Sequence, residues 1–240
     1  MKEVPVLFEN SDVIVIDKPA GLIVHSDGRT EEPSVVDWVL ARYPETKDVG
    51  EPWLSPQGAL VPRPGIVHRL DRTTSGVMIL AKTQSAYEFL KKQFQDRSTE
   101  KEYVALVYGQ PKENGGRIER EIVRIKSTPP RWGVSHGKEN KKRAAVTDWR
   151  VVARTTADGE PISVIEAKPK TGRTHQIRVH LKALGYPIIC DHLYAPTKAC
   201  LAGLTRPALH AKRLTITLPG GEVRTFEAPI PEDLRFATGA

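Results

Sequence analysis

Short strand-like stretches, more than any other pattern, limit what this chain can fold into. They combine β-branched or other apolar residues with period-two alternation, and turn-forming residues separate them. Stretches 213–218 and 222–227 flank Pro219, Gly220 and Gly221, and these turn residues predict a β-hairpin. The stretches span 12–17, 76–81, 102–108, 146–153, 161–167, 213–218 and 222–227. Because many of them are close enough in sequence to pair as hairpins, we predict an α+β fold with a mainly antiparallel sheet.

Helical periodicity is confined to a few stretches, which are 34–42, 85–95 and 174–184. Ser85 and Glu88 have the spacing of a capping box at the start of the second helix. Thr174 is the expected cap of the third helix, and Gly185 is expected to end it.

The length of 240 residues suits one domain over 1–240. Residues 44–65 are rich in proline and glycine and predict a loop insertion. No apolar run reaches the roughly 18 residues of a membrane-spanning helix, and the N-terminus does not resemble a signal peptide. Cys190 and Cys200 are too few for a disulfide scaffold or a four-cysteine zinc site, so we expect a reducing cytoplasm.

The charge balance favours a polyanionic partner. Lys and Arg total 36 against 29 Asp and Glu, for a formal net charge of +7 and an isoelectric point near 9.4. Nucleic acid is the usual partner of such a chain, and a solvated basic surface is the alternative.

A segment over 68–76 concentrates charged and hydroxyl side chains just before an apolar strand. Asp71 stands between Arg69 and Arg72, and nearby guanidinium groups favour an ionised carboxylate. Such a carboxylate can act as a nucleophile or a base. The alternative is an aspartate that bonds its own turn backbone.

A second polar segment, 170–181, opens the third predicted helix. Backbone N–H groups at such a helix start favour an anion, so Arg173 is a candidate phosphate contact. Arg178 can face a carboxylate from elsewhere in the chain. The alternative is a solvated basic helix end.

The histidines do not predict a metal site. His175 and His180 are five residues apart, which differs from the four-residue spacing of a helical zinc pair. His192 and His210 have no acidic or cysteine partner at ligand spacing. We therefore expect no bound metal.

Several motifs together resemble those of the RluA-like family of RNA pseudouridine synthases. HRLDRTTSG resembles the catalytic motif of that family, and TGRTHQIRVHL is the second highly specific match. The order of the motifs is also that of the family, and the resemblance runs from about residue 7 to about residue 230. The matching blocks are DKPAGLIVH (17–25), HRLDRTTSG (68–76), EYVALVYG (102–109), TGRTHQIRVHL (171–181), GYPIICDHLY (185–194) and ALHAKRL (208–214).

The resemblance implies a mixed, mainly antiparallel sheet with flanking helices and a central active-site cleft. It implies that Asp71 is the catalytic residue and that Arg69 fills the space left by a flipped base. It also implies that Tyr103 packs against the target base, that Arg178 pairs with the catalytic carboxylate, and that Leu209 lines the pocket.

The implied reaction isomerises uridine to pseudouridine in ribosomal or transfer RNA. No atom enters or leaves and no redox change occurs, so no cofactor is expected. Asp71 either attacks the sugar or the base, or removes the proton at the 2′ carbon of the sugar. The base must leave its stack, which calls for a pocket with an aromatic wall.

The resemblance also sets the expected partners. We expect a monomer that acts on an RNA stem–loop, without a membrane or an obligate protein partner. Basic residues Lys138, Lys141, Lys142 and Arg143 are candidate phosphate contacts, with a solvated charged loop as the alternative.

The chain departs from the family pattern in several places, one of which is the loop at 44–65, longer than many members need. Cys190 precedes Asp191 where the family commonly has glycine, which we interpret as a packing change. The catalytic motifs begin near the N-terminus, so we expect no small N-terminal RNA-binding domain. A non-catalytic RNA-binding or RNA-folding factor on the same scaffold is the alternative function, but it would not require Asp71, Tyr103 and Arg178 together.

Overall fold

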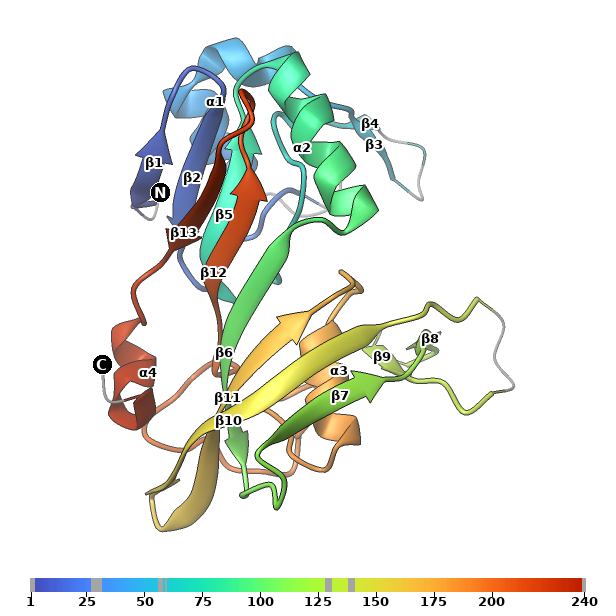
Figure 1. The fold of residues 1–240 in the computed structure, drawn as a ribbon, viewed down its shortest axis with the longest axis vertical. Coiled ribbons are helices and arrows are strands. Elements are labelled where there is room, and N and C mark those ends of the chain that lie inside the picture. The colour runs from blue at the N-terminus through green and yellow to red at the C-terminus, as the bar shows by residue number, and fades with distance from the viewer. Residues whose placement is uncertain are drawn as a thin grey trace. The chain divides into compact units, whose positions relative to one another are not determined.

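The chain folds as two units, each built around antiparallel strands (Figure 1). A computed structural model describes residues 3–26, 32–55, 58, 60–127, 131–137 and 141–238. Unit 1 consists of Met1–Glu100 and Ala211–Pro229, and unit 2 consists of Lys101–His210 and Ile230–Ala240. Two of the three passages between the units occur inside strands of the structure, at 100–101 and 210–211, rather than at a linker. This explains why the sequence pattern suggested one domain.

The sheet of unit 1 has the strand order β1-β2-β5-β12-β13. Strands β2 and β5 pair antiparallel from Val13 opposite Ala81 to Lys18 opposite Gly76. Every residue of β5 is buried, which explains its continuous apolar sequence. The predicted hairpin is present as β12 and β13. The bounds are β1 Val6–Glu9, β2 Val13–Lys18, β5 Ser75–Ala81, β12 Leu209–Thr217, whose first two residues belong to unit 2, and β13 Val223–Glu227.

The α-helices of the described part of unit 1 are α1 (Val35–Arg42) and α2 (Gln84–Asp96). Ser34 caps α1 in a reciprocal capping box with Asp37. The expected cap of α2 was wrong, because the Oγ1 of Thr83, not that of Ser85, accepts the backbone N–H of Ala86 at 3.2 Å. The buried face of α2 then packs with β2, β5 and β12 in one apolar cluster.

The segment 44–65 contains more structure than the predicted loop. It begins with a 3₁₀ helix, η1 (Pro44–Asp48), and Pro44 fits the first turn because that position needs no N–H donor. Strands β3 (Trp53–Leu54) and β4 (Leu60–Val61) then form a short antiparallel hairpin. Residues 56, 57 and 59 lie outside the described part.

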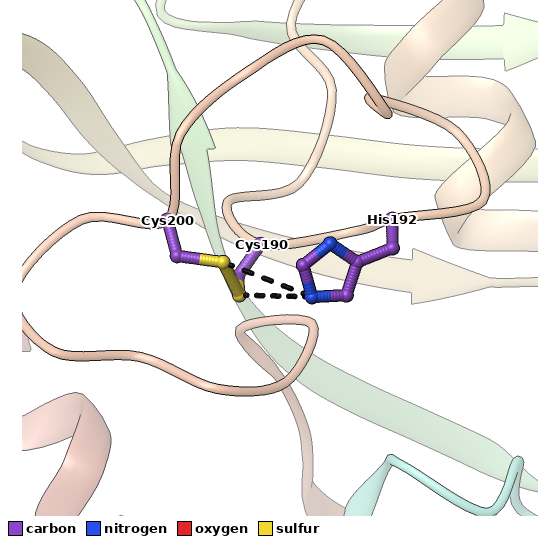
Figure 2. A group of neighbouring side chains, drawn as sticks. All are labelled: Cys190, His192 and Cys200. Atoms are coloured by element: carbon purple, nitrogen blue, oxygen red, sulfur yellow. Dashed lines mark hydrogen bonds between the residues drawn. A yellow bond between two sulfur atoms is a disulfide. The ribbon is translucent and has the colours of Figure 1, made fainter.

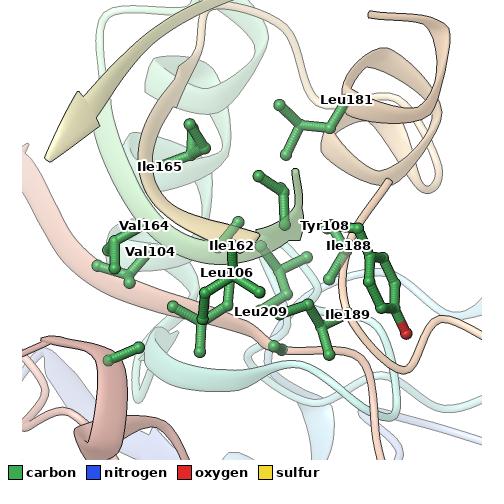
Figure 3. Packing of buried hydrophobic residues seen from close by; sticks show 14 of the residues in the cluster. Val104, Leu106, Tyr108, Ile162, Val164, Ile165, Leu181, Ile188, Ile189 and Leu209 are labelled. Atoms are coloured by element: carbon green, nitrogen blue, oxygen red, sulfur yellow. The ribbon is translucent and has the colours of Figure 1, made fainter. Parts of the chain in front are cut away.

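The sheet of unit 2 has the order β6-β11-β10-β7, and each of these neighbours pairs antiparallel. Its apolar core collects side chains from β6, β11 and α3 and from the segment before β12, as Figure 3 shows. A separate hairpin joins β8 and β9. The bounds are β6 Glu100–Tyr108, β7 Gly115–Glu119, β8 Ile122–Ile125, β9 Arg131–Val134, β10 Val146–Ala157, β11 Glu160–Pro169, α3 Gln176–Ala183 and α4 Glu232–Thr238.

Helix α3 starts later than the sequence predicted, so Thr174 is not its cap. His175 takes a left-handed conformation, with φ of 54°, and helical geometry begins at Gln176. The buried Gln176 side chain accepts hydrogen bonds from the hydroxyl of Thr171 at 2.6 Å and from the backbone N–H of Arg173 at 3.1 Å. The segment before α3 is therefore held by a side chain inside the helix.

The α+β class and the predominance of antiparallel pairing are confirmed. In the described ranges, no helix combines the length and apolar character needed to cross a membrane.

A cross-strand ion cluster lies on the sheet of unit 2. Arg150 of β10 donates to both carboxylate oxygens of Glu166 on β11, at 2.9 and 2.7 Å. Lys168 lies 3.2 Å from Glu166 and 3.3 Å from Glu102. The hydrogen bonds from Arg150, followed by those from Lys168, lower the pKa of Glu166 to about 2.

Replacement of Glu166 by glutamine should destabilise the protein by about 1 kcal/mol at neutral pH, because the amide cannot pair with Arg150. The pKa of Glu166 lies below its ordinary value of 4.5, so its stabilisation is lost as the pH falls from 4.5 toward 2. The difference between mutant and parent should therefore shrink in that window. Circular-dichroism melts over this pH range measure it, with the exposed Glu222→Gln as control. A difference that is independent of pH would contradict the assignment.

Candidate active site

Asp71 lies on a turn just before β5 in unit 1. The backbone N–H of Thr74 donates to the carbonyl oxygen of Asp71 at 3.1 Å, so a backbone hydrogen bond closes the turn. Leu70 and Thr74 are buried on either side, whereas Asp71 is half-buried. The loop is therefore anchored by its neighbours and leaves the carboxylate partly accessible.

Lys18 anchors this loop through a hydrogen bond, a role that the sequence did not indicate. Its side chain is fully buried at the end of β2. Its amine donates to the carbonyl oxygens of Leu22 at 2.8 Å, Pro19 at 3.0 Å and Arg72 at 3.3 Å. The same Arg72 oxygen accepts the backbone N–H of Gly21 at 2.8 Å. A buried ammonium group requires such acceptors, and here one of them is the residue after Asp71.

His68 stabilises this loop by contacts with β5 and α2. Its Nε2 accepts the backbone N–H of Ile79 at 3.1 Å, and its ring stacks on Phe94 with centroids 4.5 Å apart. Since Nε2 accepts a hydrogen bond from the backbone, it carries no proton in this arrangement.

Arg69 and Arg72, which flank Asp71 in the sequence, also contact residues from other segments of unit 1. Arg72 forms an ion pair with Glu32, and Arg69 lies 3.4 Å from the Nε2 of His25. Arg63 stacks over the Trp53 ring at 4.7 Å. Burial, with a smaller contribution from the charge of Arg69, lowers the pKa of Arg63 to about 10, so it remains a cation at neutral pH. The charges of Arg63 and Arg69 interact with each other, which gives this region positive charge that suits an anionic ligand, whereas Glu32 balances the charge of Arg72.

Arg178 is held in unit 2 by a buried ion pair. Its Nε and Nη2 donate to the two carboxylate oxygens of Asp191 at 2.7 and 2.9 Å. Asp191 is fully buried and also accepts the backbone N–H groups of Leu193 and Tyr194, each at 3.2 Å. A bidentate pair with extra hydrogen bonds is the form in which burial of two charges is tolerated.

The aromatic ring of Tyr194 lies against the same guanidinium. The distance from the Arg178 guanidinium carbon to the ring centroid is 4.9 Å. The Tyr194 hydroxyl lies 2.8 Å from the Nδ1 of His175 and accepts the backbone N–H of Trp132 at 3.1 Å. Arg178 is therefore fixed from two sides. The sequence motifs indicated Arg178 but neither Asp191 nor Tyr194 as its support, and the predicted pairing of Arg178 with Asp71 stays a prediction.

Tyr103 and Leu209 are both in unit 2. Tyr103 lies on β6, paired opposite Ala167 of β11, and its half-buried ring packs at the margin of the core. Leu209 is buried within that core, as Figure 3 shows, with 4% of its surface exposed. Its predicted place in a pocket wall stays a prediction.

The predicted phosphate contacts differ in their surroundings. Arg173 is half-buried, and its Nε donates to the carbonyl oxygen of Ala144 at 3.1 Å. Lys142 forms an ion pair with Glu121 at 3.3 Å, and Arg143 lies 5.9 Å from the Trp132 ring centroid. Lys141 is exposed. Lys138 lies outside the described residues.

A family model described as RNA pseudouridylate synthase matches residues 12–183. This chain belongs to the RNA pseudouridylate synthase family. The match includes Arg69, Asp71, Tyr103 and Arg178, and it ends before Asp191 and Leu209.

Individual members of the RNA pseudouridylate synthase family resemble the chain over nearly all its length. It is 37% identical over 227 residues to an RNA pseudouridine synthase of Synechocystis, which covers 94% of this chain and 65% of that protein. It is 36% identical over 236 residues to ribosomal large subunit pseudouridine synthase D of Nitrosomonas europaea, which covers 95% of this chain and 62% of that protein. The chain thus spans less than two thirds of the length of these relatives.

The fold of the RNA pseudouridylate synthase family is also found in a solved structure. Human RNA pseudouridylate synthase domain containing 1 matches with a TM-score of 0.74 at 25% identity, over 95% of this chain and 83% of that one. The similarity confirms the fold that the sequence motifs implied.

The glycine that ends the catalytic-type motif should be irreplaceable for a steric reason. Gly76 has a φ of +118°, and a Cβ there would overlap the carbonyl oxygen of Ala211. Gly76→Ala should therefore destabilise the protein by about 3 kcal/mol or more. The control is Gly220→Ala, where φ is +103° but nothing lies within 4 Å, and a cost of about 1 kcal/mol is expected. Urea unfolding measures both, and equal costs would show that the close contact is unimportant.

Proposed function

We propose that this chain is an RNA pseudouridine synthase, an isomerase that converts uridine in RNA to pseudouridine. The observation that carries the proposal is Asp71, half-buried on a turn that the buried Lys18 holds, within the segment that matches the family. A binding or folding factor would have no need for a partly accessible carboxylate on so firmly held a turn.

In this proposal Asp71 is the catalytic carboxylate. It acts as nucleophile or base while the bond between ribose and the ring nitrogen breaks, and the base rejoins the sugar through its carbon 5. The atoms of the product are those of the substrate, so the reaction needs no cofactor. Tyr103 provides an aromatic wall for the flipped base, Arg69 occupies the space that the base leaves, and Arg178 supplies a fixed cation.

We propose ribosomal RNA of the large subunit as the substrate. The name of the Nitrosomonas relative refers to that subunit, and several other similar proteins have the same name. The positive net charge and the exposed Lys141 suit an RNA backbone. The proposed location is the cytoplasm, where bacterial ribosomal RNA is made, and the proposed active form is a monomer without an obligate protein partner.

Asp71→Asn should abolish turnover while RNA affinity stays within a few-fold of the parent protein. The substitution keeps the shape of the side chain and removes its charge, so neither attack nor proton removal remains possible. Release of tritium from carbon 5 of labelled uridine measures turnover, with large-subunit ribosomal RNA and transfer RNA as parallel substrates. The control is Asp48→Asn, whose carboxylate is 87% exposed in the same unit.

Two results would reject parts of this proposal. Substantial tritium release by Asp71→Asn would remove Asp71 from the reaction. Release by the parent protein from transfer RNA alone would refute the ribosomal substrate.

Arg178→Met should lower kcat far more than Lys141→Met does. The first change removes a fixed cation and leaves the buried Asp191 without its partner, at a cost of about 3–5 kcal/mol. The second removes an exposed charge, which should weaken RNA binding and lower its salt dependence by about one unit of slope. Single-turnover rates at saturating enzyme, with melting curves to confirm folding, separate the two effects. Equal rate losses would contradict this division of roles.

A further inference from the structure

A cluster of two cysteines and one histidine lies in the loop after α3. Cys190 and Cys200 form a disulfide, with Cα atoms 4.4 Å apart. The Nε2 of His192 lies 3.7 Å from the Cys190 sulfur and 3.9 Å from the Cys200 sulfur, as Figure 2 shows. Our expectation that His192 has no cysteine partner was therefore wrong, because the fold brings Cys200 back to it.

The backbone at this cluster is held independently of the sulfur–sulfur bond. The buried hydroxyl of Tyr108 accepts the backbone N–H of Cys190 at 3.1 Å and donates to the carbonyl oxygen of Ala199 at 2.5 Å. The Tyr108 hydroxyl thus fixes both Cys190 and Ala199, the residue that precedes Cys200. Reduction of the disulfide would leave both tethers in place, so the two thiols would stay close together.

The donor atoms have the chemistry and the spacing of a zinc site. Thiolate sulfur and imidazole nitrogen are the usual zinc ligands, and a tetrahedral site with their usual bond lengths puts nitrogen and sulfur about 3.6 Å apart. The two observed nitrogen–sulfur distances are close to that value. The three ligand atoms lie within 4.8 Å of one another. The sulfurs alone must separate, to about 3.8 Å, which rotation about the Cα–Cβ bonds can provide.

The redox state of Cys190 and Cys200 decides whether the disulfide or the pair of thiols exists. Disulfides are rare in the cytoplasm, and a cysteine set in a cytoplasmic enzyme is more often metal-binding or catalytic. The presence of the reduced form rests on the proposed cytoplasmic location, whereas the ability of the reduced cysteines to bind zinc does not. A dithiol reductant delivers two electrons and two protons to the disulfide and is itself oxidised to a disulfide. Zinc then displaces the protons of the two thiols.

We propose that Cys190, His192 and Cys200, once the disulfide is reduced, bind one zinc ion. His192 is exposed and Cys200 is half-buried, so the fourth position is open to a solvent molecule. The disulfide and the zinc complex exclude each other, because both use the same sulfur atoms. In the sequence, Asp191 lies between Cys190 and His192. The disulfide and the zinc complex would therefore each close the loop whose Asp191 binds Arg178.

Metal titration of the full chain tests the proposal. Protein reduced with a phosphine, which is then removed, is titrated anaerobically with Co²⁺ and with Zn²⁺. The expected result is one equivalent bound, with the visible bands of tetrahedral Co²⁺ and a sulfur-to-cobalt charge-transfer band, all displaced by Zn²⁺. Oxidised protein should bind no metal at this site.

Matched variants identify the ligands. Cys200→Ser should weaken zinc binding by more than about 100-fold, the upper end of the cost of losing an outer partner. His192→Ala should also weaken binding and change the cobalt spectrum, whereas His136→Ala, at another exposed histidine, should do neither. Failure of the reduced protein to bind, or binding that survives Cys200→Ser or His192→Ala unchanged, would overturn the proposal. None of these outcomes depends on pseudouridine synthesis, so they are independent of the proposed function.

Discussion

A buried positive charge is tolerated only where the fold supplies acceptors for it, and this constraint acts at the candidate residues of both units. In unit 1 the fully buried amine of Lys18 has carbonyl oxygens as acceptors, and one of them belongs to the loop of Asp71. In unit 2 the guanidinium of Arg178 has the carboxylate of Asp191. In each case desolvation of the cation makes any displacement of the acceptor costly. The loop that carries Asp71 and the loop that carries Asp191 are therefore each held by a buried charge.

Local patterns predicted the elements that are governed by local physics. The strand stretches and the β12–β13 hairpin follow from alternation and turn residues, and the predicted helical stretch 34–42 begins at Ser34, the residue that caps α1. The candidate Asp71 was likewise visible, because its flanking arginines are adjacent in sequence. Errors arose at helix starts. Thr83 and Ser85 are both good caps, and only the path of the preceding chain decides between them.

The features that the sequence did not reveal depend on contacts between distant residues. Nothing in the neighbourhood of Lys18 predicts that its amine reaches Arg72, 54 positions away. His175 takes a left-handed conformation because the buried Gln176 bonds to Thr171 and Arg173 on the preceding segment. The spacing of His192 and Cys200 fits no compact zinc motif, and only the path of the loop, with the Tyr108 hydroxyl tying Cys190 to Ala199, brings them together. A spacing rule finds residues that lie close together on one helix or turn. Cys190, His192 and Cys200 come together because the loop after α3 folds back on itself.

The burial of Lys18 also makes it an internal reporter of opening in unit 1. An amine with no exposed surface cannot react with an acylating reagent while the surrounding backbone is closed. Its acylation must wait for a fluctuation that breaks its hydrogen bonds to the carbonyl oxygens of Pro19, Leu22 and Arg72. The labelling rate of this one lysine, relative to lysines on the surface, would therefore report how often the loop of Asp71 loses its support in the folded protein.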